Sequence, residues 1–537
     1  MSKSKSSKWL QSAAAVTLAA SLALPTASVS AAEPAKTSGL PIREAAAKLG
    51  AEVHWNQSKG TITLKKGDHV LVLNLGATNA VLDGKTVSLS EPVRITEGRA
   101  IVDPALISKW LTDVVKPDTA DLFLKEIQSG NGDKAAKYVS ESSAFALPAP
   151  MLGKLWKNNA ALFGKTEQQP AKQESVNSVY RNVTYTFNTD KIPFTLTVRL
   201  NSAGKVDDLY LAVATASTYQ KPAYDNAAAY TEREVTIGSG AFALPGTLTL
   251  PAGKGPFPAV VLVHGSGTND RDESIGGAKP FRDLAVGLAA QGIAVLRYDK
   301  VTYEHSFKVA SDDKFTLKRE TVDDALTAVE LLKKTEGIEA TQIFVAGHSQ
   351  GGFAMPLIIA NDQNKSIAGT ILLSGPSGKF ADVLAEQQKE IVNRVKKLGM
   401  DATPYEQQAA QYIAIANIIN DPKYTVDNMP NNFPLPPAYW WFEQKNYVPS
   451  ELVKKQSGPM LVLQGENDWQ VLMSQFEGWK AALKDRKDVE FKSYPKVNHL
   501  LAEYDGVSIG AEYAQPSNVS KTIVDDIASW VKKTAKK

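Results

Sequence analysis

The sequence predicts an α/β protein in which a doubly wound, mostly parallel sheet with a helical cap follows two small α+β domains. Three observations lead to this prediction. From about residue 230, apolar runs rich in β-branched residues alternate with helical runs, a pattern typical of parallel strands covered by helices. Between residues 38 and 222, helical runs and alternating strands form two separate short sets. A chain of 537 residues is also too long for one domain.

Residues 1–32 have the pattern of a signal peptide. Three lysines precede the apolar run "WLQSAAAVTLAASLAL", and small residues follow it up to Ala31 and Ala32. The run is short and interrupted by serines, so we expect no stable membrane insertion once the signal is removed. The chain contains no cysteine, which excludes disulfides and thiolate chemistry. We therefore expect a secreted protein that is extracellular or associated with the cell wall.

The charge of the chain is balanced. Its formal net charge is +3, and removal of the three lysines in residues 1–32 leaves a net charge of zero. With 43% hydrophobic and 22% charged residues, the composition is that of an ordinary globular protein. We therefore expect no nucleic acid and no anionic surface as a partner.

Residues 38–115 form the first expected domain. An amphipathic helix is predicted from four apolar positions at near-helical spacing, namely Leu40, Ile42, Ala46 and Leu49. Short alternating strands follow, and Asp83-Gly84 is a favoured hairpin turn between two of them. The run "GRAIVDPALISKWL" predicts a second helix at the end of the section.

This pattern of helix, strands and helix, with "LGAEVHWNQSKGTITL" and "GRAIVDPALISKWL", resembles the copper amine oxidase N-terminal domain. In that family the domain is not the site where copper binds. The two histidines of this section, His54 and His69, lack a local partner for a metal. We therefore expect no metal here, and any contact with the cell wall would come from the N-terminal domains.

Residues 117–222 form the second expected domain. Two helical runs joined by a Gly-Asn-Gly turn come first, a third helical run follows, and long antiparallel strands end the section. Helices followed by strands indicate a small α+β domain. Its aromatic residues are expected in the core rather than around a pocket, and they are Trp156, Phe163, Tyr185 and Phe187.

Residues 230–535 form the third expected domain, a doubly wound sheet. Five strands read as continuously apolar: "AVVLV", "IAVLRY", "IFVAG", "TILLS" and "MLVLQG". Ligands of such sheets lie beyond the carboxyl ends of the strands, so polar residues at these ends are candidates for a functional site.

Ser349 is the candidate nucleophile. It lies in "GHSQGG", between the strand "IFVAG" and an apolar helix, which is the context that a G-x-S-x-G turn requires. The turn raises the serine above the sheet in an unfavourable backbone conformation, so Gly347 and Gly351 must be small. The N–H group of Gln350 then opens a helix and points to where an anionic oxygen would form.

A serine hydroxyl needs a base, and the base needs an acid behind it. His499 follows the last strand, in "YPKVNH". Asp468 follows the preceding strand, in "GENDWQV", and Glu466 is the alternative acid. Of the other histidines, His264 and His348 adjoin glycine turns where backbone roles are expected. His305 lies in a run that reads as a polar loop.

The run "VVLVHGSGTNDRDE" supplies the fourth part of the expected site. The N–H group of Ser266, or that of Gly265, would be a second donor to the anionic oxygen together with Gln350. Five charged residues near this loop are expected to brace it through ion pairs rather than to act chemically: Asp270, Arg271, Asp272, Arg297 and Asp299.

These motifs carry a second resemblance. Residues 230–535, through "HGSGTNDRDE", "KPFRDLAVGLAAQGIAVLRYDK" and "AGHSQGG", look like an exported α/β-hydrolase of the esterase, dienelactone-hydrolase and serine-peptidase kin. The order Ser349, Asp468, His499 is the order of that fold. Residues 117–222 resemble a domain of unknown function that often precedes such hydrolases. The resemblance implies a serine hydrolase with a catalytic triad, an oxyanion hole and no cofactor.

The alternation of strands and helices breaks over about residues 376–457. Such hydrolases commonly carry a helical cap at this place, and the run "AYWWFE" lies within it. Trp440 and Trp441 are candidate substrate-binding residues that would form an apolar wall. They fit equally well as the core that seats the cap.

The sequence therefore predicts a secreted carboxylic ester hydrolase that acts on a small molecule through an acyl-enzyme. A serine peptidase or aminopeptidase of the same fold is the first alternative, because cap acids such as Glu386, Glu390 and Glu443 could hold a substrate amine. A surface-binding protein with an incidental hydrolase fold is the second alternative.

Overall fold

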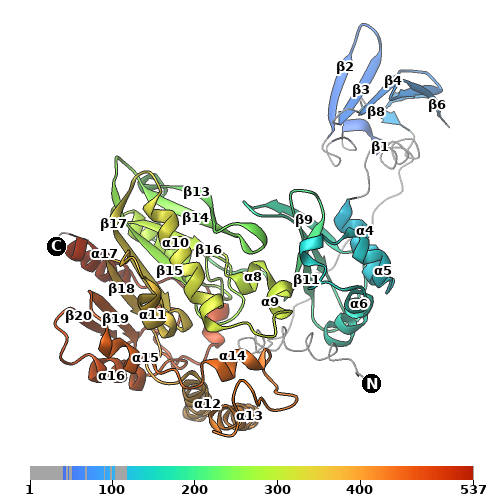
Figure 1. The fold of residues 1–537 in the computed structure, drawn as a ribbon. Helices are drawn as coiled ribbons and strands as arrows, with labels where there is room; N and C mark the ends of the chain where they lie inside the picture. The colour runs from blue at the N-terminus through green and yellow to red at the C-terminus, as the bar shows by residue number, and fades with distance from the viewer. Residues whose placement is uncertain are drawn as a thin grey trace. The chain divides into compact units, whose positions relative to one another are not determined.

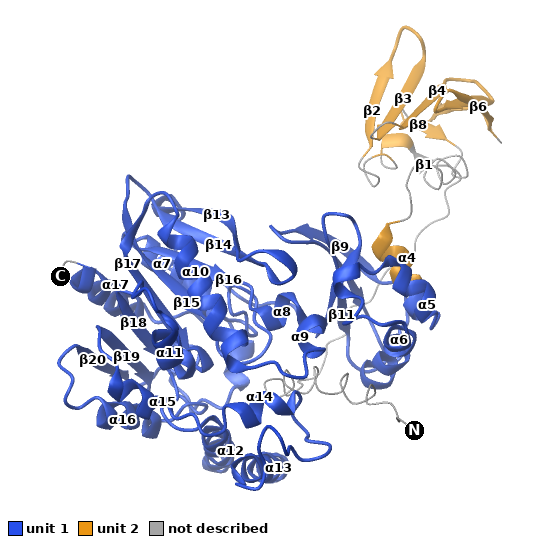
Figure 2. Ribbon diagram, viewed as in Figure 1, with its two compact units in different colours: residues 1–22, 126–537 blue, residues 23–125 orange. Residues whose placement is uncertain are grey.

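The structure is a computed structural model that describes residues 40–43, 46, 51–66, 69–89, 91–96, 99–102 and 118–535. It divides into two compact units, which Figure 2 shows in different colours. One unit comprises residues 23–125, and the other comprises residues 1–22 and 126–537. Among the described helices, none has both the length and the apolar character that a membrane span requires.

The unit of residues 23–125 is built from two small antiparallel sheets. The larger sheet has the order β2–β3–β4–β5–β6 and the smaller one has the order β1–β8–β7. Their bounds are β1 Leu40–Pro41, β2 Glu52–Asn56, β3 Thr61–Lys66, β4 His69–Asn74, β5 Asn79–Leu82, β6 Lys85–Ser88, β7 Arg94–Thr96 and β8 Arg99–Val102. Buried side chains of β3, β4 and β5 form its core, including Leu64, Leu71 and Ala80.

The hairpin predicted at Asp83-Gly84 is confirmed. Leu82 pairs with Lys85 across it, and the two turn residues have φ angles of 48° and 78°. These angles match the two-residue turn that suits the twist of the strands.

The predicted signal peptide lies outside the described residues. The helix predicted from Leu40 to Leu49 is described only in part: Leu40–Pro41 form strand β1, which pairs with β8, whereas Ile42, Arg43 and Ala46 are helical. The closing helix is wrong for Arg99–Val102, because these residues form strand β8 between β1 and β7, and the rest of that run lies outside the described residues.

Residues 118–222 form helices and one antiparallel sheet, as predicted. The helices are α4 Thr119–Gln128, α5 Gly132–Ala135 and α6 Ala149–Phe163. The sheet has the order β12–β11–β10–β9, with bounds β9 Ala171–Val176, β10 Arg181–Phe187, β11 Phe194–Leu200 and β12 Val206–Val213. Phe163 stacks on Phe194, with ring centroids 4.8 Å apart, and Phe187 packs against the same ring. Phe163, Tyr185 and Phe187 are buried core residues, whereas Trp156 borders a small cavity of about 140 Å³.

An eight-stranded sheet forms the body of the third section, with the order β13–β14–β16–β15–β17–β18–β19–β20 (Figure 1). Strand β14 runs antiparallel to both of its neighbours, and the remaining pairs are parallel. The bounds are β13 Tyr230–Ile237, β14 Leu244–Pro251, β15 Phe257–Val263, β16 Ala294–Tyr298, β17 Ile338–His348, β18 Gly369–Leu373, β19 Met460–Gly465 and β20 Val489–Tyr494. The predicted doubly wound, mostly parallel sheet is therefore confirmed.

Helices cover both faces of this sheet. On one face, α7 (Pro280–Ala289) and α17 (Lys521–Ala535) pack on apolar side chains such as Leu262 and Phe344. On the other face lie α10 (Asp323–Lys333), α11 (Gln350–Asn361) and α16 (Met473–Ala482), against side chains such as Val261 and Val345. Successive residues of β15 and β17 thus enter opposite cores, which explains why these strands are apolar throughout.

The cap predicted over residues 376–457 is a helical insertion between β18 and β19. It contains α12 (Phe380–Lys397), α13 (Thr403–Asn420), α14 (Ala438–Glu443) and α15 (Pro449–Leu452). Buried Ala381, Ala416 and Ile419 pack the two long helices together.

Buried ion pairs join residues 126–222 to the hydrolase section. Arg199 Nη2 lies 3.2 Å from Glu304 Oε2, and Lys308 Nζ lies 2.5 Å from Asp207 Oδ2. His305, expected in a polar loop, lies instead between α8 (Val301–Glu304) and α9 (Ser306–Ala310), and it is fully buried. That expectation is wrong because the partners of this polar run come from the preceding domain: His305 Nδ1 lies 3.1 Å from the Tyr180 hydroxyl.

Candidate active site

Ser349 occupies a strained turn between β17 and α11. Its φ and ψ angles are 50° and −113°, a conformation that costs a non-glycine residue about 1–3 kcal/mol. The surrounding structure holds it there, since the Ser349 N–H group donates to the Leu373 carbonyl at 2.9 Å and its carbonyl accepts from Phe353 at 2.9 Å. The side chain is half-buried at the carboxyl end of the parallel strands. The predicted strand–turn–helix is therefore present.

The glycines around Ser349 are required by close backbone contacts. A Cβ atom on Gly347 would lie 2.4 Å from the Gly351 carbonyl group, and one on Gly351 would lie 2.3 Å from the Val263 carbonyl oxygen. Gly265 lies against the turn as well, because its Cβ would be 3.2 Å from that of Ser349. The small neighbours allow the helix, the strand and the loop of Gly265 to meet at the serine.

Asp468 and His499 form a buried pair near this turn. His499 Nδ1 lies 2.7 Å from Asp468 Oδ2. Asp468 Oδ1 also accepts the N–H groups of Gln470 and Val471, at 2.8 Å and 3.0 Å. Burial raises the pKa of Asp468, but the charge of His499 and these hydrogen bonds outweigh it and the pKa is lowered. A carboxylate therefore fixes the proton of His499 on Nδ1 and leaves Nε2 as the basic nitrogen.

The alternative acid, Glu466, does not contact His499. Its carboxylate is exposed and accepts a hydrogen bond from the Ser493 hydroxyl at 2.7 Å. Of the two acids considered from the sequence, the structure brings only Asp468 to the imidazole.

His499 contacts His348, the residue that precedes Ser349. The rings of His348 and His499 have centroids 4.7 Å apart, and His348 Nε2 lies 2.9 Å from the His499 carbonyl oxygen. The hydrogen bonds of the described residues do not join the Ser349 hydroxyl directly to His499. In serine hydrolases the hydrogen bond between serine and base often tightens only when substrate binds.

Of the two candidate loop donors, Ser266 is the one left available. The Gly265 N–H group donates to Glu273 Oε1 at 2.7 Å, so it is already occupied. In the described part of the chain, the N–H group of Ser266 has no backbone acceptor, and neither has that of Gln350 at the start of α11. The alternative of Gly265 is therefore wrong, and the pair Ser266 and Gln350 remains the predicted oxyanion hole.

Glu273 links the loop to the turn, and sequence reasoning missed it. Its second carboxylate oxygen lies 2.9 Å from Nδ1 of His348, and both side chains are buried. The two residues come from distant loops, and a glutamate after a glycine-rich loop has no distinctive sequence signal. The sequence favours a backbone role for His348, whereas the structure shows its side chain in contact with Glu273.

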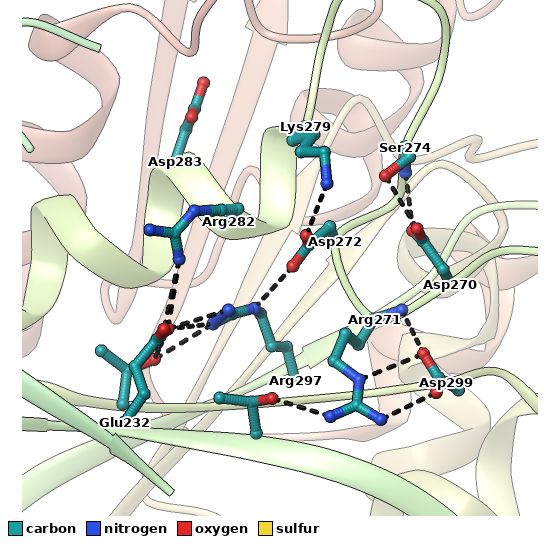
Figure 3. Close-up of polar contacts among 12 residues, drawn as sticks. Glu232, Asp270, Arg271, Asp272, Ser274, Lys279, Arg282, Asp283, Arg297 and Asp299 are labelled. Atoms are coloured by element: carbon teal, nitrogen blue, oxygen red, sulfur yellow. Dashed lines mark hydrogen bonds and ion pairs between the residues drawn. The ribbon is translucent and has the colours of Figure 1, made fainter. Parts of the chain in front are cut away.

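Four of the five charged residues beyond the loop form the expected ion pairs, whereas Asp270 instead accepts hydrogen bonds from the N–H and hydroxyl groups of Ser274 (Figure 3). Arg271 pairs with Asp299 at 2.9 Å, and Arg297 lies 2.9 Å from Asp272. Arg297 also reaches Glu232 of β13 at 2.8 Å. This network ties the loop after β15 to strand β13 at the edge of the sheet.

The two candidate substrate-binding tryptophans differ in burial. Trp440 is 7% exposed, packs edge-on against Phe380, and its indole N–H donates to Glu320 at 2.6 Å. These contacts favour the seating role for Trp440. Trp441 is half-buried and packs between the cap and the hydrolase core, so its role as a wall stays a prediction.

Within the described ranges, no group of three or more histidine, aspartate or glutamate side chains is arranged to hold a metal ion. His69 instead pairs with Asp83 of the hairpin at 2.7 Å, and His264 bonds the Asp270 carbonyl at 3.1 Å. Burial lowers the pKa of His264 to about 4, so this ring is neutral near pH 7.

A mostly parallel eight-stranded sheet, a strained serine turn at its carboxyl edge and an acid–histidine pair beside it define an α/β-hydrolase. Known proteins agree with this class. The chain belongs to the α/β-hydrolase family of Esterase EstD from Thermotoga maritima, with which it shares 30% identity over 415 residues, covering 77% of this chain and 95% of EstD. It is thus an esterase-type hydrolase.

Family models match two parts of the chain. Residues 26–122 match the copper amine oxidase N-terminal domain, and residues 255–504 match the model described as serine aminopeptidase, S33. A second relative is acyl-coenzyme A amino acid N-acyltransferase 2 from Rattus norvegicus, 26% identical over 264 residues, covering 48% of this chain and 52% of that protein. Among solved structures, Est1E from Butyrivibrio proteoclasticus with bound ferulic acid is similar, with a TM-score of 0.38, 19% identity, and coverage of 56% of this chain and 100% of that one.

Proposed function

We propose that this protein is a secreted carboxylic ester hydrolase that uses Ser349, His499 and Asp468 through an acyl-enzyme. The observation that carries the proposal is the buried Asp468–His499 pair beside the strained Ser349 turn. Its small-molecule ester substrate would be held under the cap. No metal or organic cofactor takes part in this mechanism.

In the first half-reaction, the Ser349 hydroxyl attacks the ester carbonyl carbon while His499 Nε2 accepts its proton. Asp468 stabilises the imidazolium that forms, because its carboxylate faces the Nδ1–H group at 2.7 Å. The negative oxygen accepts hydrogen bonds from the N–H groups of Ser266 and Gln350. His499 then gives the proton to the leaving alcohol.

In the second half-reaction, water attacks the acyl-enzyme with His499 again acting as the base. The same two N–H groups stabilise the second tetrahedral intermediate. Collapse of this intermediate releases the acid and returns the proton to Ser349, so the enzyme is regenerated without any other reactant.

Contacts in the cap engage two of the three acids that could hold a substrate amine. A peptidase of this fold would need a free acid to hold the substrate amine, yet Glu386 accepts hydrogen bonds from Ser474 and Gln475. Glu390 is paired with Arg394 at 2.7 Å. Of the three cap acids considered, Glu443 alone makes no ion pair or hydrogen bond among the described residues. The match to the aminopeptidase model keeps a peptidase as the second candidate function.

Labelling with a fluorophosphonate probe tests the mechanism, and chromogenic substrates test the bond. We expect wild-type protein to be labelled and to hydrolyse p-nitrophenyl butyrate, while Ser349→Ala loses both activities by about 10⁴-fold or more. Ser374→Ala is the matched control, because Ser374 also follows a sheet strand with a positive φ of 49° but has a buried hydroxyl. It should be labelled like the wild type.

Three outcomes would contradict the proposal. Unlabelled wild-type protein, or undiminished labelling of Ser349→Ala, would favour the surface-binding alternative. Faster cleavage of an aminoacyl p-nitroanilide than of the ester would favour the peptidase.

Secretion is a separate part of the proposal. It is supported by the signal pattern of residues 1–32, and a contact of the N-terminal domains with the cell wall would keep some protein at the surface. Cell fractionation tests it: the mature protein should start near residue 32 and be found in the medium or the wall fraction. Intact protein in the cytoplasm would contradict it.

A further inference from the structure

A buried lysine lies behind the oxyanion loop. Lys300 follows β16, is 2% exposed, and its Nζ atom donates to the Gly265 carbonyl oxygen at 2.8 Å. Asn269 Nδ2 donates to the same oxygen at 3.2 Å. Nothing in the mechanism above uses these two donors, although lysine is seldom buried without a purpose or a partner.

The contact of Lys300 with the Gly265 carbonyl affects the Ser266 N–H group through the geometry of one peptide group. The Gly265 carbonyl and the Ser266 N–H group belong to the same trans peptide, so they point in opposite directions from one rigid plane. A cation that holds the carbonyl on one side therefore aims the N–H group at the other side. Withdrawal of electron density by the charged donor also makes that N–H group a stronger hydrogen-bond donor.

The lysine is itself held by a carboxylate. Glu320 Oε1 lies 2.6 Å from Lys300 Nζ, and both groups are buried. Glu320 belongs to a π-helical turn, Lys318–Val322, which precedes α10. Such turns are uncommon and occur often at functional sites.

The same turn also contacts the other oxyanion donor. Thr321, the next residue, accepts a hydrogen bond from the Gln350 side chain at 3.2 Å. The π-helical turn thus braces both predicted donors, Ser266 through Lys300 and Gln350 directly.

Glu320 also connects Lys300 and the π-helical turn to the cap. Its second oxygen accepts the indole N–H of Trp440, in α14, at 2.6 Å. A continuous buried path therefore runs from Trp440 through Glu320 and Lys300 to the Gly265–Ser266 peptide.

We propose that Lys300 is a positioning residue that orients and polarises the Ser266 N–H group. In this proposal, Trp440 holds Glu320 and thereby Lys300, so the orientation of the N–H group depends on the position of the cap. The proposal rests on the proposed function, because it assigns Ser266 to the oxyanion hole. Lys300 does not touch the substrate. Its effect is on the transition state, where the negative oxygen forms.

Replacement of Lys300 by methionine tests the proposal. Lys300→Met should lower kcat for p-nitrophenyl butyrate by about 10- to 100-fold with KM changed less than about threefold, because only transition-state stabilisation is lost. Binding of a trifluoromethyl ketone, which forms an oxyanion with the serine, should weaken by the same factor as kcat. Trp440→Phe keeps the ring packing but removes the N–H group, so it should lower kcat by a smaller factor, about three- to tenfold.

A matched control separates positioning from simple loss of a buried charge. Lys308 is also fully buried, pairs with Asp207 and donates to a carbonyl, that of Ala241, but it does not contact the oxyanion loop. Lys308→Met should destabilise the fold yet leave kcat within about twofold of the wild type.

Lys300→Met leaves Glu320 unpaired and could unfold for that reason, so the double variant Lys300→Met/Glu320→Gln keeps the test decisive. It removes both charges and should show the same loss of kcat in a folded protein. Wild-type kcat in either folded variant would overturn the inference. So would a substitution that weakens the binding of substrate and of ketone by the same factor, because the transition state would then not be affected selectively. If wild-type protein is not labelled by the fluorophosphonate, the proposed function itself fails, and that result is distinct from these.

Discussion

Glu273 Oε2 lies 2.9 Å from Nδ1 of His348, the residue immediately before Ser349, in a fully buried ion pair. The other ring nitrogen of His348 faces the His499 carbonyl oxygen at 2.9 Å. Both neighbouring oxygens can only accept protons, so these two contacts favour an imidazolium with a proton on each nitrogen. Burial lowers the pKa of His348, but the charge of Glu273 outweighs burial and the pKa is raised.

Glu273→Gln should lower the free energy of unfolding by about 3 kcal/mol, because it leaves a buried imidazolium without its counter-charge. Urea denaturation followed by tryptophan fluorescence measures the change. Glu477→Gln is the control, since its ion pair with Lys480 is exposed and should contribute less than about 1 kcal/mol. Equal effects of the two substitutions would contradict a charged pair at His348.

The contribution of the Glu273–His348 pair to the free energy of unfolding should be largest within a defined pH range. Burial raises the pKa of Glu273, but His348 outweighs burial and the pKa is lowered from 4.5. The contribution of Glu273 to the free energy of unfolding is therefore present above pH 4.5 and is lost as pH falls further. The pKa of His348 is raised from 6.5, so its contribution is present below pH 6.5 and is lost as pH rises through the higher value. The stability difference between wild type and Glu273→Gln should therefore be largest between pH 4.5 and 6.5. A difference that keeps growing above pH 8 would be inconsistent with this assignment.

Asp324 should make the protein less stable as pH rises. Burial, followed by the charge of Asp323, raises its pKa from 3.8 to about 8, and its Oδ2 atom is shielded without a hydrogen-bond partner. Between these values the folded state holds one proton more than the unfolded state, so the unfolding free energy falls by up to about 1.4 kcal/mol per pH unit. Asp324→Asn should remove this slope, and the exposed control Asp313→Asn should not. Parallel curves for the wild type and Asp324→Asn would show that the carboxyl is ionised throughout.

Asp468→Asn should lower kcat by about 10³- to 10⁴-fold, because the amide can no longer hold His499 in the tautomer with a basic Nε2. The control is Glu466→Gln, since that acid contacts Ser493 rather than the imidazole. It should retain kcat within about twofold. Steady-state hydrolysis of p-nitrophenyl butyrate gives both values, and a larger loss for Glu466→Gln would exchange the two roles.

Ser266→Ala should retain kcat within about twofold, because the side chain is exposed and the proposed donor is the backbone N–H group. Ser266→Pro removes that N–H group and should lower kcat by about 10²- to 10³-fold. Circular dichroism shows whether each variant is folded. Equal activity of folded alanine and proline variants would remove Ser266 from the oxyanion hole.

Much of the site was predictable because its signals are local. A glycine, serine, glycine turn between an apolar strand and an apolar helix needs only neighbouring residues to be recognised, and so does the Asp83-Gly84 hairpin. The choice of Asp468 over Glu466 was also made from the sequence, since the acid must follow its strand at a suitable distance. The fold class follows from the alternation of apolar strands and helices.

The supporting contacts could not be predicted, because they depend on segments that are distant in the chain. Glu273 meets His348, and Lys300 meets Glu320, only after the sheet has brought several loops to one edge. The burial of His305 depends on Tyr180 from the preceding section. The choice of Ser266 over Gly265 depends on which N–H group a carboxylate occupies, and spacing does not encode this.

The buried pairs Arg199–Glu304 and Asp207–Lys308 determine where this enzyme can be divided in protein engineering. A truncated protein that begins near residue 230 would expose Glu304 and Lys308 without their ion-pair partners. A shortened protein intended for fusion or surface display must therefore keep residues 126–222 together with the hydrolase section.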